Sequence, residues 1–162
     1  MNHDDIEPLE PGVWLVQLRK LASSAPRSEE ALNRSLRRGF YLAQLTPRPL
    51  RHIVDCNLSE RKFEQLLETG AQLTAALALV GDRLNYRVAR LDGGGRIEAE
   101  VWFPNEKPCG TASGLAVPVA IFQAWLQCLS TLDQRADFSL WSACLPAPRK
   151  SQSAQRQKLI EH

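Results

Sequence analysis

The stretch that decides the fold is residues 84–104, LNYRVARLDGGGRIEAEVWFP, in which two alternating runs flank a cluster of glycines. Alternation with a period of two on both sides of such a cluster is typical of a β-hairpin. We therefore predict two paired strands, with residues 92–95 as the loop between them. The side chains on the inward face are apolar: Leu84, Tyr86 and Val88 in the first run, and Ile97, Ala99, Val101 and Phe103 in the second.

A loop at residues 92–95 sets the register of the hairpin. Three inward-facing pairs follow: Val88 with Ala99, Tyr86 with Val101, and Leu84 with Phe103. On the opposite face Arg87 stands across from Glu100, a favourable cross-strand charge pair. The apolar pattern and the charges thus predict the same register.

Two helices are predicted ahead of the hairpin. Residues 13–22 have apolar side chains at helical spacing, and Ser28 is a suitable N-cap for a second helix that ends at Gly39. Residues 40–45, FYLAQL, form a short apolar run that we interpret as a buried strand. A long helix is then expected from Ser59 to about residue 80, closed by Gly81. The arginines near the end of the second helix are interpreted as a solvated basic face: Arg34, Arg37 and Arg38.

After the hairpin, residues 105–114 are expected to form a loop. Pro118 suits the first turn of a helix that runs to about residue 132 and is apolar on a broad surface. Residues 137–145 alternate again and are predicted to be the last strand. The fold class is therefore α+β: a four-stranded antiparallel sheet in the ferredoxin-like order β-α-β-β-α-β, preceded by two helices.

The 162 residues are enough for one domain with a real core, expected at residues 13–145. Residues 1–12 are interpreted as a flexible lead-in, and residues 146–162 as a polar, basic and disordered tail. A net charge of +2 does not by itself indicate a polyanionic partner, and no apolar run is long enough to span a bilayer. The acidic first residues do not resemble a signal peptide. The four cysteines form no CxxC pair, so we expect free thiols in the cytoplasm, with no metal and no cofactor.

The order of elements around the Gly-rich hairpin resembles the GGDEF domain of diguanylate cyclases. Residues 88–91, VARL, followed by Gly93 and Gly94, are similar to the signature hairpin of that family. Residues 40–50 are similar to the strand before its metal-binding turn, and residues 50–71 to the segment that lines its guanine pocket. The resemblance covers roughly residues 28–145. It implies that nucleotide contacts would fall on Asp82, Arg90, Gly93, Gly94 and Gly95.

The chain departs from that family where the family holds magnesium. Thr46 and Arg48 occupy the turn, and Gly95 and Arg96 occupy the loop, where carboxylates are expected. A hard cation needs oxygen ligands, usually with at least one carboxylate. The resemblance therefore implies a domain that has lost cyclase chemistry, and a non-enzymatic regulatory or partner-binding role with no catalytic residues.

Two other motifs offer alternatives. Residues 50–67 resemble a helix-turn-helix, in which case the chain would be a small DNA-binding regulatory protein, although acidic residues among the exposed positions weaken attraction to phosphate. Residues 108–111, PCGT, resemble the Cys-Gly-Thr loop of cofactor-independent amino-acid racemases and epimerases. That chemistry needs a second opposed base and a two-lobed chain, so a loop cysteine without a catalytic role is the simpler interpretation of Cys109.

The expected working surface is the outer face of the hairpin together with the loop after it. Trp102 lies on that face among charges of both signs, which suits a protein partner or self-association. The competing interpretation is that Trp102 packs under the helix at residues 13–22, which carries Trp14. The residues assigned to the partner surface are Arg87, Glu98, Glu100 and Trp102.

Overall fold

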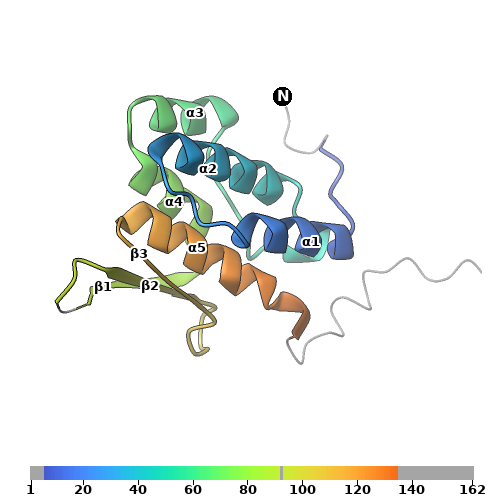
Figure 1. Cartoon of the computed structure of the whole chain (residues 1–162). Coiled ribbons are helices and arrows are strands. Elements are labelled where there is room, and N and C mark those ends of the chain that lie inside the picture. Colours follow the sequence, from blue (N-terminus) through green and yellow to red (C-terminus); the bar gives the residue numbers. More distant parts are fainter. Residues whose placement is uncertain (1–5, 92, 135–162) are drawn as a thin grey trace, which may run out of the picture.

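The helices stack on one side of a three-stranded antiparallel sheet (Figure 1) in the computed structural model, which describes residues 6–91 and 93–134. The sheet has the order β1-β2-β3, and α5 lies directly on it, with α1, α2, α3 and α4 beyond. The chain is thus a mixed α+β structure. Its elements are α1 (Pro11–Ala22), α2 (Glu29–Gln44), the 3-10 turn η2 (Arg48–Leu50), α3 (Glu60–Glu68), α4 (Gln72–Val80), β1 (Asn85–Arg90), β2 (Ile97–Trp102), β3 (Gly110–Gly114), α5 (Val117–Ser130) and the 3-10 turn η3 (Leu132–Gln134).

The hairpin and its register are confirmed. β1 pairs with β2 so that Val88 faces Ala99 and Arg87 faces Glu100. Arg87 Nε donates to Glu100 Oε2 at 2.7 Å, so the expected charge pair forms. Ile97, Ala99 and Val101 turn toward α5 and are buried.

α5 is the centre of the core. It packs against β2 and β3 on one side and against α4 and α1 on the other. A helix enclosed on both sides must be apolar nearly all round, and this explains the broad apolar surface seen in the sequence. Its buried residues are Ala120, Ile121, Phe122, Gln123, Ala124, Trp125, Leu126, Cys128 and Leu129.

The predicted strand at residues 40–45 is wrong, because these residues complete α2. A short apolar run does not separate a buried strand from a buried helical segment. The helix continues through Gly39, where the absence of a side chain makes room for Phe122, since a Cβ there would lie 2.7 Å from Phe122 Cε2. Phe40 then stacks on Phe63, with ring centroids 4.5 Å apart.

The helix expected from Ser59 to residue 80 is divided. Ser59 does cap its start by accepting a hydrogen bond from the Lys62 N–H, and Gly81 does close its end. In between, α3 stops at Glu68 and Gly70 takes a φ of 74°, a left-handed conformation that glycine adopts readily. Beyond the break α4 packs against α5, whereas α3 contacts α2 through the Phe40–Phe63 ring stack.

Part of the predicted loop at residues 105–114 is a strand. β3 pairs with β2, and its inward positions are all small: Gly110, Ala112 and Gly114. They lack the branched side chains that signal a strand. Their size is set by α5, since a Cβ on Gly110 would lie 1.9 Å from the Ala124 carbonyl oxygen.

The ferredoxin-like order is not shown. Its first strand belongs to α2, and the described sheet consists of three strands that follow one another along the chain. The last predicted strand, at residues 137–145, and the tail at 146–162 lie outside the described residues. In the predicted lead-in, Pro11 and Gly12 already belong to α1.

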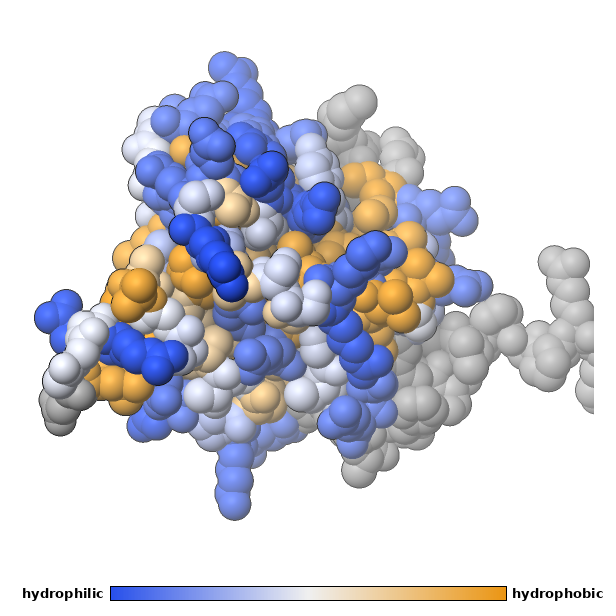
Figure 2. All heavy atoms as spheres, viewed as in Figure 1, coloured by the Kyte–Doolittle hydropathy of each residue, from blue (hydrophilic) through white to orange (hydrophobic). Residues whose placement is uncertain are grey.

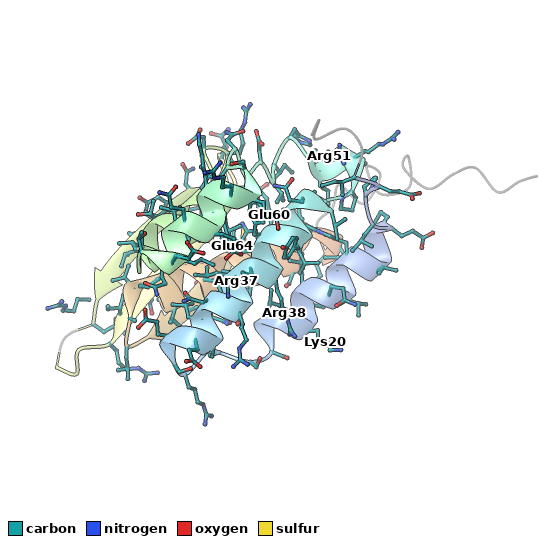
Figure 3. The ribbon with its side chains drawn as sticks, turned by 90° about the horizontal axis from the view of Figure 1, so that it is seen from above. Lys20, Arg37, Arg38, Arg51, Glu60 and Glu64 are labelled. Atoms are coloured by element: carbon teal, nitrogen blue, oxygen red, sulfur yellow. The ribbon has the colours of Figure 1, made fainter. Side chains whose placement is uncertain are left out.

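Side-chain contacts tie the outer helices together. The Trp14 indole of α1 is fully buried and its Nε1–H donates to the Leu42 carbonyl of α2 at 2.8 Å. Arg37 of α2 bonds both carboxylate oxygens of Glu64 on α3, at 2.8 and 2.9 Å (Figure 3). One arginine of the predicted basic face is therefore a structural contact between two helices.

The close packing of β3 against α5 can be tested by adding a side chain at Gly110. Gly110→Ala forces a methyl group against the helix backbone, which cannot yield as a flexible side chain would. We expect the free energy of unfolding to fall by about 3 kcal/mol, the upper end of the usual overpacking range. Gly94→Ala is the matched control, because a Cβ there meets nothing within 4 Å. Urea unfolding measures both variants, and equal stabilities would contradict the packing described.

Candidate partner-binding surface

β1 is one of the two edge strands of the described sheet, and all six of its residues are exposed, whereas β3 at the other edge is partly buried. Tyr86 keeps 48% and Val88 36% of its surface exposed, and Leu91, just beyond the strand, keeps 39%. An edge strand with apolar side chains is a template for pairing with another chain unless the protein covers or charges it. β1 therefore has the character of a contact surface.

The exposure of β1 follows from the position of α5. Tyr86 and Val88 lie on the same sheet face as their partners Val101 and Ala99, which are fully buried beneath the helix. α5 covers β2 and β3 but reaches β1 only at a few points. The apolar side chains on the sheet face that packs against α5 consequently continue onto β1, where the helix no longer covers them. Apolar surface is seen over the hairpin at the left of Figure 2.

The free edge of β1 also presents backbone groups. The Leu91 N–H donates to the Arg96 carbonyl at 2.8 Å, so Leu91 directs its backbone groups toward the neighbouring strand. In an antiparallel pair, the backbone N–H and C=O groups of successive residues point alternately toward the paired strand and away from it. The N–H and C=O groups of Tyr86, Val88 and Arg90 accordingly point away from β2.

The four residues predicted for the partner surface lie together on the sheet face opposite α5. Arg87 and Glu100 form the ion pair described above, and Glu98 is half-buried across from Ser113. Trp102 is half-buried across from Asn85. α1 does not cover it, because α1 packs against α5 and α2 on the far side of the helical layers. The four residues thus share one face of the sheet, and their role as a partner surface stays a prediction.

The residues that the family resemblance assigned to a nucleotide are not gathered into one site. Asp82 precedes β1, whereas Arg90 and Gly93–Gly95 lie at its other end, and a six-residue strand spans about 20 Å. Asp82 instead lines a hollow of about 220 Å³ with Asp55, Asn57 and Arg83. A Cβ on any of the three glycines would meet nothing within 4 Å, so the tip projects away from the body.

Residues 50–67 contain one α-helix rather than two. η2 and a turn precede an extended segment, and α3 begins only at Glu60. Glu64 of α3 is engaged by Arg37, and Glu60 accepts a hydrogen bond from the Tyr41 hydroxyl at 2.7 Å. This face of α3 is therefore directed at α2, although DNA binding by the segment stays a prediction.

Cys109 and Cys128 are free thiols that interact, a pairing that their separation in sequence conceals. A hydrogen bond from Cys128 is the main cause that lowers the pKa of the Cys109 thiol to about 7, with a further contribution from the Thr131 side chain. The same bond and burial raise the pKa of Cys128. Cys109 is half-exposed and Cys128 fully buried, so Cys109 is the reactive member of the pair.

Comparison of the chain with protein-family models, with curated proteins and with solved structures finds no match. Within the described ranges, no three His, Cys, Asp or Glu side chains gather closely enough to hold a metal ion. None of the described helices combines the length and apolarity that crossing a bilayer requires.

The lowered pKa of Cys109 predicts alkylation by iodoacetamide with a midpoint near pH 7. A lowered pKa means that the reactive thiolate is already present at neutral pH and is lost only as the pH falls below about 7. Cys128→Ala removes the donor and should move the midpoint upward. Cys56, whose pKa burial raises, is the internal control and should react later. Peptide-resolved mass spectrometry across pH makes the measurement, and a shared midpoint near 9 for Cys109 and Cys56 would refute the pairing.

Proposed function

We propose that this chain is a partner-binding regulatory domain that works by adding a strand to the free edge of β1, and that a second copy of the chain supplies the strand. The observation that carries the proposal is an edge strand exposed along its whole length, with Tyr86 and Val88 left outside the cover of α5. Strand addition uses backbone hydrogen bonds for affinity and alternate side chains for specificity.

The backbone of β1 supports pairing of two identical edges. Tyr86, Val88 and Arg90 direct their N–H and C=O groups outward, so three successive alternate positions are available. An antiparallel pair centred on Val88 joins Val88 with the partner's Val88, and Tyr86 with the partner's Arg90. A two-fold axis then gives each chain the same contacts, as in most homodimers.

The side chains are compatible with that register. On the face shared with α5, each Tyr86 ring meets the partner's Arg90, an arrangement that allows a cation–π contact, and the two valines meet at the axis. On the opposite face Arg87 stands across from the partner's Ala89, so the two arginines are not directly opposed. Like charges directly opposite would destabilise the pair, and this register avoids them.

The outer face of the sheet extends the proposed surface. Two paired hairpins would form one continuous six-stranded sheet, with Trp102, Glu98 and the Arg87–Glu100 pair repeated on its open side. Within the described part of the chain, no helix covers this face. The resemblance to the GGDEF domain, which remains a prediction, fits a regulatory role in which binding has replaced catalysis.

The substitution Val88→Pro tests whether two chains pair through the backbone hydrogen bonds of β1. Proline removes the N–H that points away from β2, and an edge strand tolerates proline at such a position. Two hydrogen bonds across the axis are lost, each worth about 1 kcal/mol, so the dimer should weaken about thirtyfold. Sedimentation equilibrium over a concentration series measures the change.

Val88→Thr is the matched control, because it keeps both the backbone donor and the branched side chain. It should dimerise with nearly the affinity of the wild type, and all three proteins should share one circular dichroism spectrum. A wild-type chain that stays monomeric throughout the series, or a Val88→Pro variant that dimerises equally well, would overturn the proposal.

A further inference from the structure

A groove between α1 and α2 gathers unpaired positive charge. Two adjoining hollows of about 250 and 370 Å³ share Ser24, Ser35 and Arg38 in their walls. Arg27 and Arg34 line the first hollow, and Lys20 lines the second. Figure 3 shows Lys20 and Arg38 close together between the two helices. Four cations thus converge on one depression.

The cations in this groove differ from three arginines elsewhere that are neutralised by a carboxylate. Arg19, Arg37 and Arg87 each form an ion pair with a carboxylate. Within residues 6–91 and 93–134, by contrast, Lys20, Arg27, Arg34 and Arg38 form no ion pair, and neither hollow has an acidic residue in its lining. Glu30 lies one helical turn before Arg34, outside the lining. Arg34 and Arg38 are also four residues apart on α2, a spacing at which like charges repel.

The two ends of the groove differ in character. The first hollow combines three guanidinium groups with the hydroxyls of Ser24 and Ser35, donors that suit phosphate oxygens. The second adds the side chains of Leu21, Leu42 and Tyr41, together with Gln17. A ligand that fits both ends has a phosphorylated part and an organic part with some apolar surface.

We propose that the groove between α1 and α2 binds a nucleotide-sized phosphate ester, with its phosphates on Arg27, Arg34 and Arg38 and its organic part against Leu21, Leu42 and Tyr41. The inference is independent of the dimer proposed above, since none of these residues lies on the sheet. A small ligand is favoured over nucleic acid because four cations line one depression without an acidic residue in its walls. A nucleic-acid footprint would instead follow an extended basic stripe on a more strongly basic chain.

Isothermal titration calorimetry with ADP, pyrophosphate and adenosine tests the proposal on the full chain. ADP should bind, and adenosine should bind at least about tenfold more weakly because it lacks the groups that the arginines contact. Pyrophosphate should fall between them, since it leaves the second hollow empty. The variant Arg34→Gln with Arg38→Gln should lose at least about tenfold in affinity for ADP.

The matched control is Arg61→Gln with Arg83→Gln, which removes the same charge from exposed positions outside the groove. It should retain the wild-type affinity for ADP within about twofold, since distant exposed charges are screened. Thermal melting confirms that each variant is folded, and Arg34→Gln alone replaces the double variant if that one melts early. The proposal would be overturned if ADP did not bind, or if both double variants lost affinity for ADP equally. It would also be overturned if the protein bound a 20-base-pair DNA duplex but did not bind ADP.

Discussion

The burial of α5 from both sides is the constraint on which the rest of the structure depends. A helix that touches a sheet on one face and other helices on the opposite face has little polar surface, and its neighbours must approach closely. The inward positions of β3 are therefore no larger than alanine, and Gly39 of α2 leaves room for Phe122. The same requirement separates α3 from α4 at Gly70, because α4 must lie against α5 while α3 packs on α2. Small residues are thus placed where the central helix requires them.

This constraint also explains which parts of the fold could be predicted. The hairpin is a local structure whose alternation, loop and charges all lie within 21 residues, and its register was predicted pair by pair. Ser28 and Ser59 are local caps, and both helix starts were predicted correctly. Residues 40–45 and β3 were predicted wrongly because their conformations depend on residues far away in sequence. Gly110 has no strand propensity of its own and is held in β3 by Val101 and by the α5 backbone.

The candidate sites also divide into features that local sequence predicts and features that depend on contacts distant in sequence. That Arg87, Glu98, Glu100 and Trp102 share one face follows from a period of two, so the sequence was sufficient to group them. That β1 lies at an edge where α5 covers little of it depends on strand order, and no pattern in residues 85–90 indicates it. The arginines of α2 illustrate the point within one helix. Arg37 and Arg38 are adjacent in sequence, yet one is neutralised by Glu64 and the other faces α1 across a groove. Sequence alone assigned both to a solvated face.

The distance in sequence between α1 and α5 has a consequence for how the protein is made. Trp14 and Leu18 are fully buried in the finished structure, and α1 packs against a helix that begins at Val117. A ribosome adds about 5–20 residues per second, so the roughly 100 residues between them take on the order of 5–20 s to appear. Of the described helices that pack closely on α1, α2 is synthesised early in that interval and α5 only at its end. The apolar face of α1 is consequently not fully covered until α5 has been synthesised.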